Sequence, residues 1–327
     1  MKKLAVIGCG HWGSNHIRVF SSIRGVEIVM VSDLSKKILK KISFRYPNLI
    51  STPNYKDIIK NNDIDAVIVA TNAKSHHKIV KECLLNKKDV LCEKPLTLNT
   101  KECEELIQIA KRNKLILMVG HIFLHNNGII ALKNYINSDE IGKLLYIYTT
   151  RTNLGPIRND VNAVYDLATH DISILNYLLG SEPTDVDVKG NCYLQKHIED
   201  VAFISLNYPR NILCNIHVSW LAPGKTRQIV VVGDKKMICW DDINSETIKI
   251  FNKGVIKEKE YDDYGQFQLN TRDNGIIIPK MDLQEPLLAE AKYFINCLNT
   301  RNINLNNGVD ALKVVKVLEL LNKQLNK

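Results

Sequence analysis

In this 327-residue chain, a lysine at the end of an apolar run occupies a position that suits a catalytic residue. Lys94 lies in the tripeptide Glu93-Lys94-Pro95, which closes the apolar run 89–93. If that run is a strand of a parallel sheet, Lys94 lies at the sheet edge where such folds bind ligands. A partly desolvated lysine there suits proton transfer to or from a hydroxyl. The alternative is a loop that carries an ordinary surface lysine.

A carboxylate and an imidazole form the second candidate for a catalytic group. Asp166 and His170 are four residues apart in a helical pattern over 163–179, so they share one face of the predicted helix. A carboxylate this close can orient the imidazole and raise its basicity. The alternative is a surface pair that contributes about 0.3 kcal/mol, and Asp171 is equally compatible with a helix-surface charge. Four further polar residues precede the pair: Arg151, Asn153, Arg158 and Asn162.

A glycine-rich loop opens the chain and is its clearest ligand-binding motif. Gly8, Gly10 and Gly13 form the pattern GxGxxG directly between an apolar run and a helical pattern. The first glycine permits a tight turn, the second lets the backbone approach a pyrophosphate, and the third lets helix and strand pack closely. The helix N-terminus then offers N–H groups to the phosphates. The alternative is a glycine turn that binds nothing.

An acidic residue follows this loop at the spacing expected for a dinucleotide site. Asp33 ends the second apolar run, 20 residues past Gly13 (33 − 13). A carboxylate there accepts hydrogen bonds from the ribose hydroxyls and repels a 2′-phosphate, which favours NAD over NADP. Lys36 and Lys37 follow closely and keep NADP open.

The secondary structure that must position these residues changes near Gly120, from alternating strands and helices to a succession of strands. Before it, short apolar runs alternate with longer helical patterns, which predicts an α/β Rossmann domain with a doubly wound parallel sheet. The predicted strands are 4–8, 26–32, 65–70, 89–93 and 115–120, and the predicted helices are about 14–24, 35–45, 76–87 and 100–113.

After Gly120, strand-like runs follow one another with short turns, which predicts an α+β domain with an open, mainly antiparallel sheet. The runs are 144–153, 185–194, 200–207, 212–220, 228–233 and 236–241. The stretch 252–285 has little periodicity and predicts an extended loop. Helices are expected at about 286–298 and 308–325. We therefore expect an NAD-binding domain over 1–120 and a substrate-binding and oligomerisation domain over 121–327, with the C-terminal helices free to pack back on the first.

Composition restricts the class of partner. The formal net charge of +9 indicates nucleic-acid binding, an acidic small ligand or simply lysines on solvated faces. The lysines are spread along the chain without a basic stripe, which argues against nucleic acid, and an anionic, phosphate-bearing ligand fits better. The eight cysteines include no CxxC pair, so neither a metal site nor a disulfide framework is expected. No apolar run is long enough to span a bilayer, and the N-terminus lacks a signal-peptide pattern, so we expect a cytoplasmic protein.

The glycine loop GCGHWG, the EKP tripeptide and the D-x-x-x-H helix, in that order, resemble the Gfo/Idh/MocA family of oxidoreductases over essentially the full length. The resemblance implies that Lys94, Asp166 and His170 line the site beside the nicotinamide. It also matches Thr71-Asn72 and His76 to a family segment next to the nicotinamide ribose. The implied cofactor contacts are Gly8, Gly10, His11, Trp12, Gly13, Asp33, Thr71, Asn72, His76, Glu93 and Lys94.

Residues 151–180, 198–203 and 217–233 resemble the nucleotide-sugar dehydrogenases of that family more narrowly. These oxidise the 3-hydroxyl of UDP-N-acetylglucosamine or its uronate. The implied substrate contacts are Lys94, Arg151, Asn153, Arg158, Asn162 and His170, and Lys225 and Arg227 could reach a diphosphate or be surface residues. Tyr165, Thr169 and Asn127 depart from the family's usual tryptophan, proline and proline, which affects contacts more than chemistry.

The resemblance thus implies NAD-dependent hydride transfer from a sugar carbon, with Lys94 or His170 as the base and Asp166 orienting or tuning it. A dehydrogenase of a free sugar or inositol is the nearest alternative, and a non-catalytic dinucleotide-binding regulator is the alternative of another class. An exposed apolar face on the antiparallel sheet would be covered by a second subunit, so we expect a homodimer or homotetramer.

Overall fold

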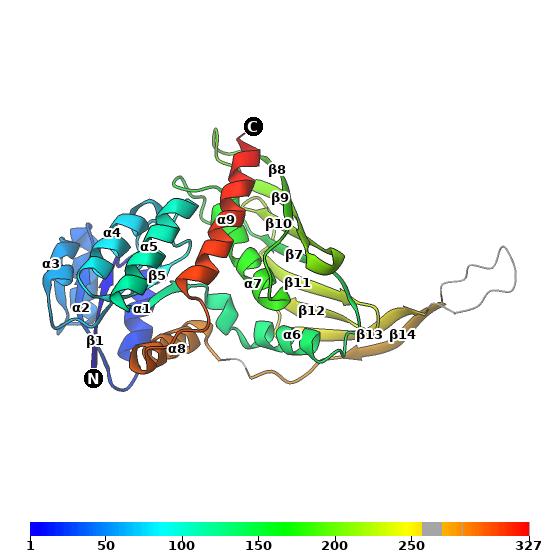
Figure 1. The fold of residues 1–327 in the computed structure, drawn as a ribbon, viewed down its shortest axis with the longest axis horizontal. Coiled ribbons are helices and arrows are strands. Elements are labelled where there is room, and N and C mark those ends of the chain that lie inside the picture. The colour runs from blue at the N-terminus through cyan, green and yellow to red at the C-terminus, as the bar shows by residue number, and fades with distance from the viewer. Residues whose placement is uncertain (257–269, 283, 327) are drawn as a thin grey trace, which may run out of the picture. The chain divides into compact units, whose positions relative to one another are not determined.

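The computed structural model describes residues 1–256, 270–282 and 284–326, which form two compact units (Figure 1). The first unit comprises Met1–Asn126 and Gln284–Glu319, and the second comprises Asn127–Leu283 and Leu320–Lys327. In the described ranges, no helix is long and apolar enough to cross a membrane.

The first unit is built on a six-stranded, entirely parallel sheet in the order β3-β2-β1-β4-β5-β6. This confirms the predicted doubly wound sheet. The strands are β1 (Lys2–Ile7), β2 (Val26–Ser32), β3 (Ile50–Thr52), β4 (Ala66–Val69), β5 (Asp89–Glu93) and β6 (Leu117–Gly120). The helices are α1 (His11–Ser21), α2 (Lys36–Arg45), α3 (Tyr55–Lys60), α4 (Ala73–Leu85), α5 (Thr100–Asn113), η1 (Ile122–His125), α8 (Pro286–Thr300) and α9 (Gly308–Leu325), the last as far as Glu319.

Helices cover both faces of this sheet, which is why its central strands are nearly continuous apolar runs, such as Ala66–Val69 of β4. One face packs against α3, α4, α5 and α9, and the other packs against α1, α2 and α8 (Figure 1). Phe20 of α1 and Phe294 of α8 meet edge to face with ring centroids 6.2 Å apart. The sequence did not indicate β3 and α3, because a strand of three residues and a helix of six are too short to show a period.

The second unit contains an eight-stranded sheet in the order β14-β13-β12-β11-β7-β10-β9-β8. Its one parallel pair among the described strands is β7 with β10, so the predicted mainly antiparallel sheet is confirmed. The strands are β7 (Leu144–Thr152), β8 (Asp185–Asn191), β9 (Val201–Tyr208), β10 (Ile212–Ser219), β11 (Thr226–Gly233), β12 (Met237–Asp241), β13 (Ile248–Ile256) and β14 (Asn270–Ile277). The helices are α6 (Asn127–Asn137), η2 (Val164–Ala168), α7 (Thr169–Leu179) and η3 (Pro209–Asn211).

The two faces of this sheet differ in burial. Inward residues such as Ile147, Ile216 and Trp240 are fully buried on the face that α6 and α7 cover (Figure 1). The opposite face leaves large apolar side chains exposed on neighbouring strands: Tyr146, Tyr148, Phe203 and Leu213. Alternation of this kind is usual for a sheet that packs a core on one side only.

One expectation for the second unit is wrong. The stretch 252–285 was expected to be a loop, but β13 extends to Ile256 and pairs antiparallel with β14. Residues 257–269 of that stretch lie outside the described residues. An edge strand is held by backbone hydrogen bonds and buries little, so its sequence needs no apolar period; Ile276 and Ile277 are accordingly exposed.

Candidate active site

The glycine loop packs too tightly for side chains at two of its three positions. Gly8 has φ +88°, and a Cβ on it would lie 2.6 Å from the Ala70 carbonyl oxygen. A Cβ on Gly13 would lie 1.8 Å from the Gly8 carbonyl oxygen, whereas nothing lies within 4 Å of one on Gly10. No side chain caps α1 at Gly10, so its first N–H groups are available to an anion. The loop therefore has the close packing and the open backbone that a pyrophosphate requires.

A cavity of about 430 Å³ lies beside this loop at the carboxyl ends of β1, β2 and β4. Its lining includes Gly8, Gly10, Asp33, Thr71 and Asn72. The two oxygens of the Asp33 carboxylate accept hydrogen bonds from the backbone N–H groups of Cys9 and Ser35, both at 2.8 Å. These bonds fix the carboxylate in the cavity wall, and its remaining lone pairs can accept from ribose hydroxyls. The residues present thus fit an adenosine and its phosphates.

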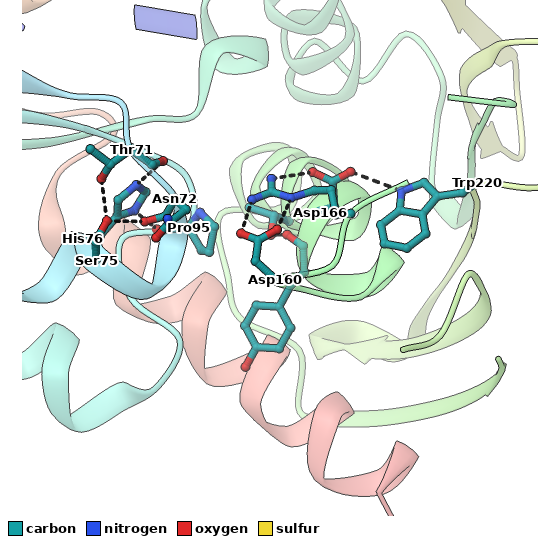
Figure 2. Close-up of polar contacts among 11 residues, drawn as sticks. Thr71, Asn72, Ser75, His76, Pro95, Asp160, Asp166 and Trp220 are labelled. Atoms are coloured by element: carbon teal, nitrogen blue, oxygen red, sulfur yellow. Dashed lines mark hydrogen bonds and ion pairs between the residues drawn. The ribbon is translucent and has the colours of Figure 1, made fainter. Parts of the chain in front are cut away.

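His76 joins the loops that follow β4 and β5. Its Nδ1 lies 2.8 Å from the Pro95 carbonyl oxygen and its Nε2 lies 3.1 Å from that of Thr71 (Figure 2). Ser75 donates its hydroxyl proton to Thr71 or to the Asn72 carbonyl, each at 2.8 Å. His76 is buried, so these contacts hold the backbone on the far side of Lys94 in place.

Glu93 anchors the other side of Lys94. Its Oε1 lies 2.8 Å from Nε2 of the buried His16 on α1, and its Oε2 accepts a bond of 3.3 Å from the Lys94 N–H. Burial raises the pKa of Glu93, but the His16 hydrogen bond and the charges of His16, Lys94 and His76 outweigh it and lower that pKa below its ordinary value. Glu93 is therefore a buried carboxylate that joins the backbone of Lys94 to α1.

A third buried histidine lies near Lys94. His121 directly follows β6, and neither of its ring nitrogens has a hydrogen-bond partner among the described residues. Burial, reinforced by the Lys94 charge, lowers the pKa of His121 to about 4. His121 is therefore a neutral imidazole at neutral pH.

In the second unit, Asp166 is held by an arginine and a tryptophan. Its Oδ1 accepts from Arg158 Nη1 and its Oδ2 accepts from Trp220 Nε1, both at 3.2 Å (Figure 2). Arg158 also donates from Nε and Nη2 to the two oxygens of Asp160, at 2.8 and 2.6 Å. Asp166 lies in η2, a single π-helical turn before α7, and such turns occur frequently at functional sites.

Arg151 is buried in an ion pair next to His170. Its Nε and Nη2 donate to the two oxygens of Asp171, at 2.7 and 3.3 Å, and both side chains are nearly inaccessible to solvent. The pair ties the end of β7 to the first turn of α7, where His170 is also buried. Asp171 is therefore a core residue and no helix-surface charge.

The remaining predicted contact residues include both bonded and exposed side chains. Asn162 donates to Glu199 at 2.7 Å and to Asn322 at 3.2 Å, and its oxygen accepts the Tyr165 N–H at 3.1 Å. The Asn153 side chain packs against Gly155. Arg227 pairs with Asp242 at 2.9 Å, whereas Lys225 is exposed. His11 and Trp12 are exposed in the first turn of α1.

Several residues of these networks were not singled out from the sequence: His16, His121, Asp160 and Trp220. Two of them carry a recognisable signal, because they directly follow a strand that ends beside a candidate residue. His121 follows β6, which pairs with β5, and Trp220 follows β10, which pairs with the end of β7. His16 and Asp160 show no such signal.

Two family models match most of the chain. The model described as "Oxidoreductase family, NAD-binding Rossmann fold" (GFO_IDH_MocA) matches residues 2–121. The model described as "GFO/IDH/MocA C-terminal domain" matches residues 129–239.

Individual proteins are similar to the chain at lower identity. Inositol 2-dehydrogenase of Salmonella typhimurium is 29% identical over 191 residues, which cover 57% of each protein. UDP-N-acetylglucosamine 3-dehydrogenase GnnA from Acidithiobacillus ferrooxidans superposes with a TM-score of 0.80 at 22% identity, covering 99% of this chain and 97% of that one. GenD2 from gentamicin A biosynthesis, solved in complex with NAD, superposes with a TM-score of 0.84 at 18% identity, covering 100% and 94%. At these identities the two structures establish the fold.

Proposed function

Because this chain belongs to the Gfo/Idh/MocA family of NAD-binding oxidoreductases, we propose that it oxidises the 3-hydroxyl of a UDP-N-acetylhexosamine or its uronate. The enzyme acts on CH–OH groups and uses NAD, which excludes a regulator without catalysis. The observation that carries the proposed substrate is Arg158 beside Asp166, a guanidinium for substrate oxyanions next to a candidate catalytic carboxylate. The activity named for GnnA and the likeness of residues 151–180 to nucleotide-sugar dehydrogenases support it.

The proposed chemistry requires a base for the hydroxyl proton and a support for that base. NAD, when bound, supplies the hydride acceptor. Gly8, Gly10 and Asp33 hold the dinucleotide, and Thr71, Asn72 and His76 lie by the loop that carries Lys94. Lys94 or His170 takes the proton, and Asp166 orients or tunes that base.

The support for each base is built into its own unit. Glu93 and His76 hold the backbone on the two sides of Lys94, and the Arg151–Asp171 pair holds the turn that carries His170. Trp220 and Arg158 each donate a hydrogen bond to Asp166, which stabilises its ionised form.

The test is NADH absorbance in the presence of NAD⁺ and a panel of UDP-N-acetylglucosamine, its uronate, free sugars and myo-inositol. We expect reduction with a UDP-sugar and a loss of about two to four orders of magnitude in kcat for Lys94→Ala with NAD affinity retained. Near-native turnover of that variant would remove Lys94 from the mechanism.

A dehydrogenase of a free sugar or inositol is the second candidate, because inositol 2-dehydrogenases are among the curated relatives. Activity on myo-inositol without any nucleotide would favour it. Arg158→Gln would then leave the affinity for the substrate unaffected, whereas a UDP-sugar dehydrogenase would lose affinity for its substrate.

A second copy of the chain is the proposed cover for the exposed apolar face of the second sheet. Tyr146, Tyr148, Phe203 and Leu213 lie on that face and are each at least 39% exposed. Exposed apolar patches of this kind mark association surfaces. Light scattering should report a homodimer or homotetramer, and Tyr148→Lys should shift it toward monomer.

A further inference from the structure

Asp160 occupies the edge of Arg158 that could bind a ligand. Arg158 donates from Nε to Oδ1 of Asp160 at 2.8 Å and from Nη2 to Oδ2 at 2.6 Å, a side-on, two-bond pair. This is the geometry in which arginine binds any carboxylate or phosphate. The third donor in use, Nη1, contacts Asp166 instead.

The carboxylates already bonded to Arg158 do not favour an incoming anion at that guanidinium. Arg158 faces two of them, those of Asp160 and Asp166. An oxyanion that approached the cluster would meet repulsion from both aspartates. Arg158 can therefore attract a substrate oxyanion strongly only after Asp160 leaves it.

The position of Asp160 allows it to leave. Its side chain is 20% exposed and that of Arg158 is 30% exposed, so solvent reaches the pair. Asp160 lies in the irregular segment 153–162 between β7 and η2, so no helix or strand hydrogen bond has to break. Asp166, in contrast, is fixed in η2 and bonded to Trp220.

We propose that Asp160 is an internal competitor, which occupies the oxyanion-binding edge of Arg158 until a substrate oxyanion displaces it. This inference rests on the proposed function, because it assigns Arg158 to a substrate oxyanion. Asp160 then sets the affinity for that oxyanion, since the apparent dissociation constant equals the intrinsic one divided by the fraction of protein in which Asp160 has left Arg158. A partly exposed ion pair leaves about one fifth of the protein free, a fivefold effect equivalent to about 1 kcal/mol.

The test uses Asp160→Asn, which removes the charge and keeps the size of the side chain. The matched control is Asp139→Asn, which removes the same charge from an exposed pair with Lys235 (3.3 Å) before the start of β7. KM is measured with NAD⁺ for UDP-N-acetylglucosamine and its uronate. Dissociation constants for the same compounds, UDP and D-glucuronate come from tryptophan fluorescence.

We expect Asp160→Asn to lower KM and the dissociation constant about fivefold, with the effect on KM rather than on kcat, and the control to match the wild type. An effect on both sugars and on UDP assigns the diphosphate to Arg158, and an effect confined to the uronate and glucuronate assigns the carboxylate. In an Arg158→Gln background the Asp160 substitution should have no effect.

Unchanged or weaker binding of every probe by Asp160→Asn would overturn the inference, because Asp160 would then hold Arg158 in place for Asp166. The fluorescence titrations keep this result separate from the proposed function. Tighter binding without NADH formation would refute the reaction and leave the competitor intact. NADH formation with substrate affinities that Asp160→Asn leaves unaltered would support the reaction and refute the competitor role of Asp160.

Discussion

The buried pair of Arg151 and Asp171 gives the sharpest prediction for the second unit. Their side chains are 4% and 1% exposed, so Asp171→Asn removes the carboxylate that pairs with a buried arginine charge. For charge centres about 4 Å apart at an effective dielectric constant of about 20, the lost attraction is about 4 kcal/mol. Breaking one partner of a buried pair typically costs about 3–5 kcal/mol. We therefore expect the free energy of unfolding to fall by about 3–4 kcal/mol.

Urea unfolding followed by tryptophan fluorescence measures this loss, because Trp220 and Trp240 are buried in the same unit. Asp187→Asn, on an exposed position of β8, is the control and should change the free energy of unfolding by less than about 0.5 kcal/mol. The double variant Arg151→Met, Asp171→Leu should recover most of the lost stability, because no unpaired charge remains. A loss below about 1 kcal/mol for Asp171→Asn would refute the reasoning.

Three further outcomes follow from the first unit. Gly13→Ala should abolish measurable NAD binding by calorimetry, because its Cβ would lie 1.8 Å from the Gly8 carbonyl oxygen; retained affinity would contradict that packing. Asp33→Ala should lower the ratio of kcat/KM for NAD⁺ over NADP⁺ at least about tenfold, since the carboxylate that repels a 2′-phosphate is gone. His121 has a pKa of about 4 in the folded protein against an ordinary 6.5, so the unfolded chain binds its proton first as pH falls. The free energy of unfolding is therefore unaffected by this proton above about pH 6.5 and falls by about 2 kcal/mol by pH 5. Urea unfolding at pH 7 and pH 5 should show a smaller fall in the free energy of unfolding for His121→Gln than for the wild type.

The glycine loop could be predicted because its geometry depends on neighbours in the sequence. Gly8, Gly10 and Gly13 follow a strand and precede a helix, and the structure places them in that order. The carboxylate of Asp33 likewise lies at the cavity beside the loop. A local motif of this kind can be predicted from neighbouring residues alone.

The partners of the charged residues could not be predicted in the same way. Arg151 bonds to a residue 20 positions later, and His16 bonds to one 77 positions later. In each case the pairing depends on which helix covers which strand end, and the sequence does not encode that locally. Helical spacing placed Asp166 and His170 on one face, but it gave no indication of Arg158 and Trp220, which donate hydrogen bonds to Asp166 from outside the helix.

Parallel strand pairs explain where the candidate residues gather in both units. In the first sheet, the carboxyl ends of β1, β4 and β5 carry Gly8, Thr71 and Lys94. In the second sheet, β7 and β10 are parallel neighbours, in register from Leu213 with Tyr146 to Ser219 with Thr152, so Trp220 follows one strand where the other ends.

Two parallel neighbours end at the same edge, and the loops that leave them start side by side. An antiparallel pair would send one of those loops to the opposite edge. The single parallel pair in a sheet that is otherwise antiparallel among its described strands therefore has a direct consequence. It brings the segment after β7, with Arg158 and Asp160, to the same edge as Trp220, and the hydrogen bonds of Asp166 join the two.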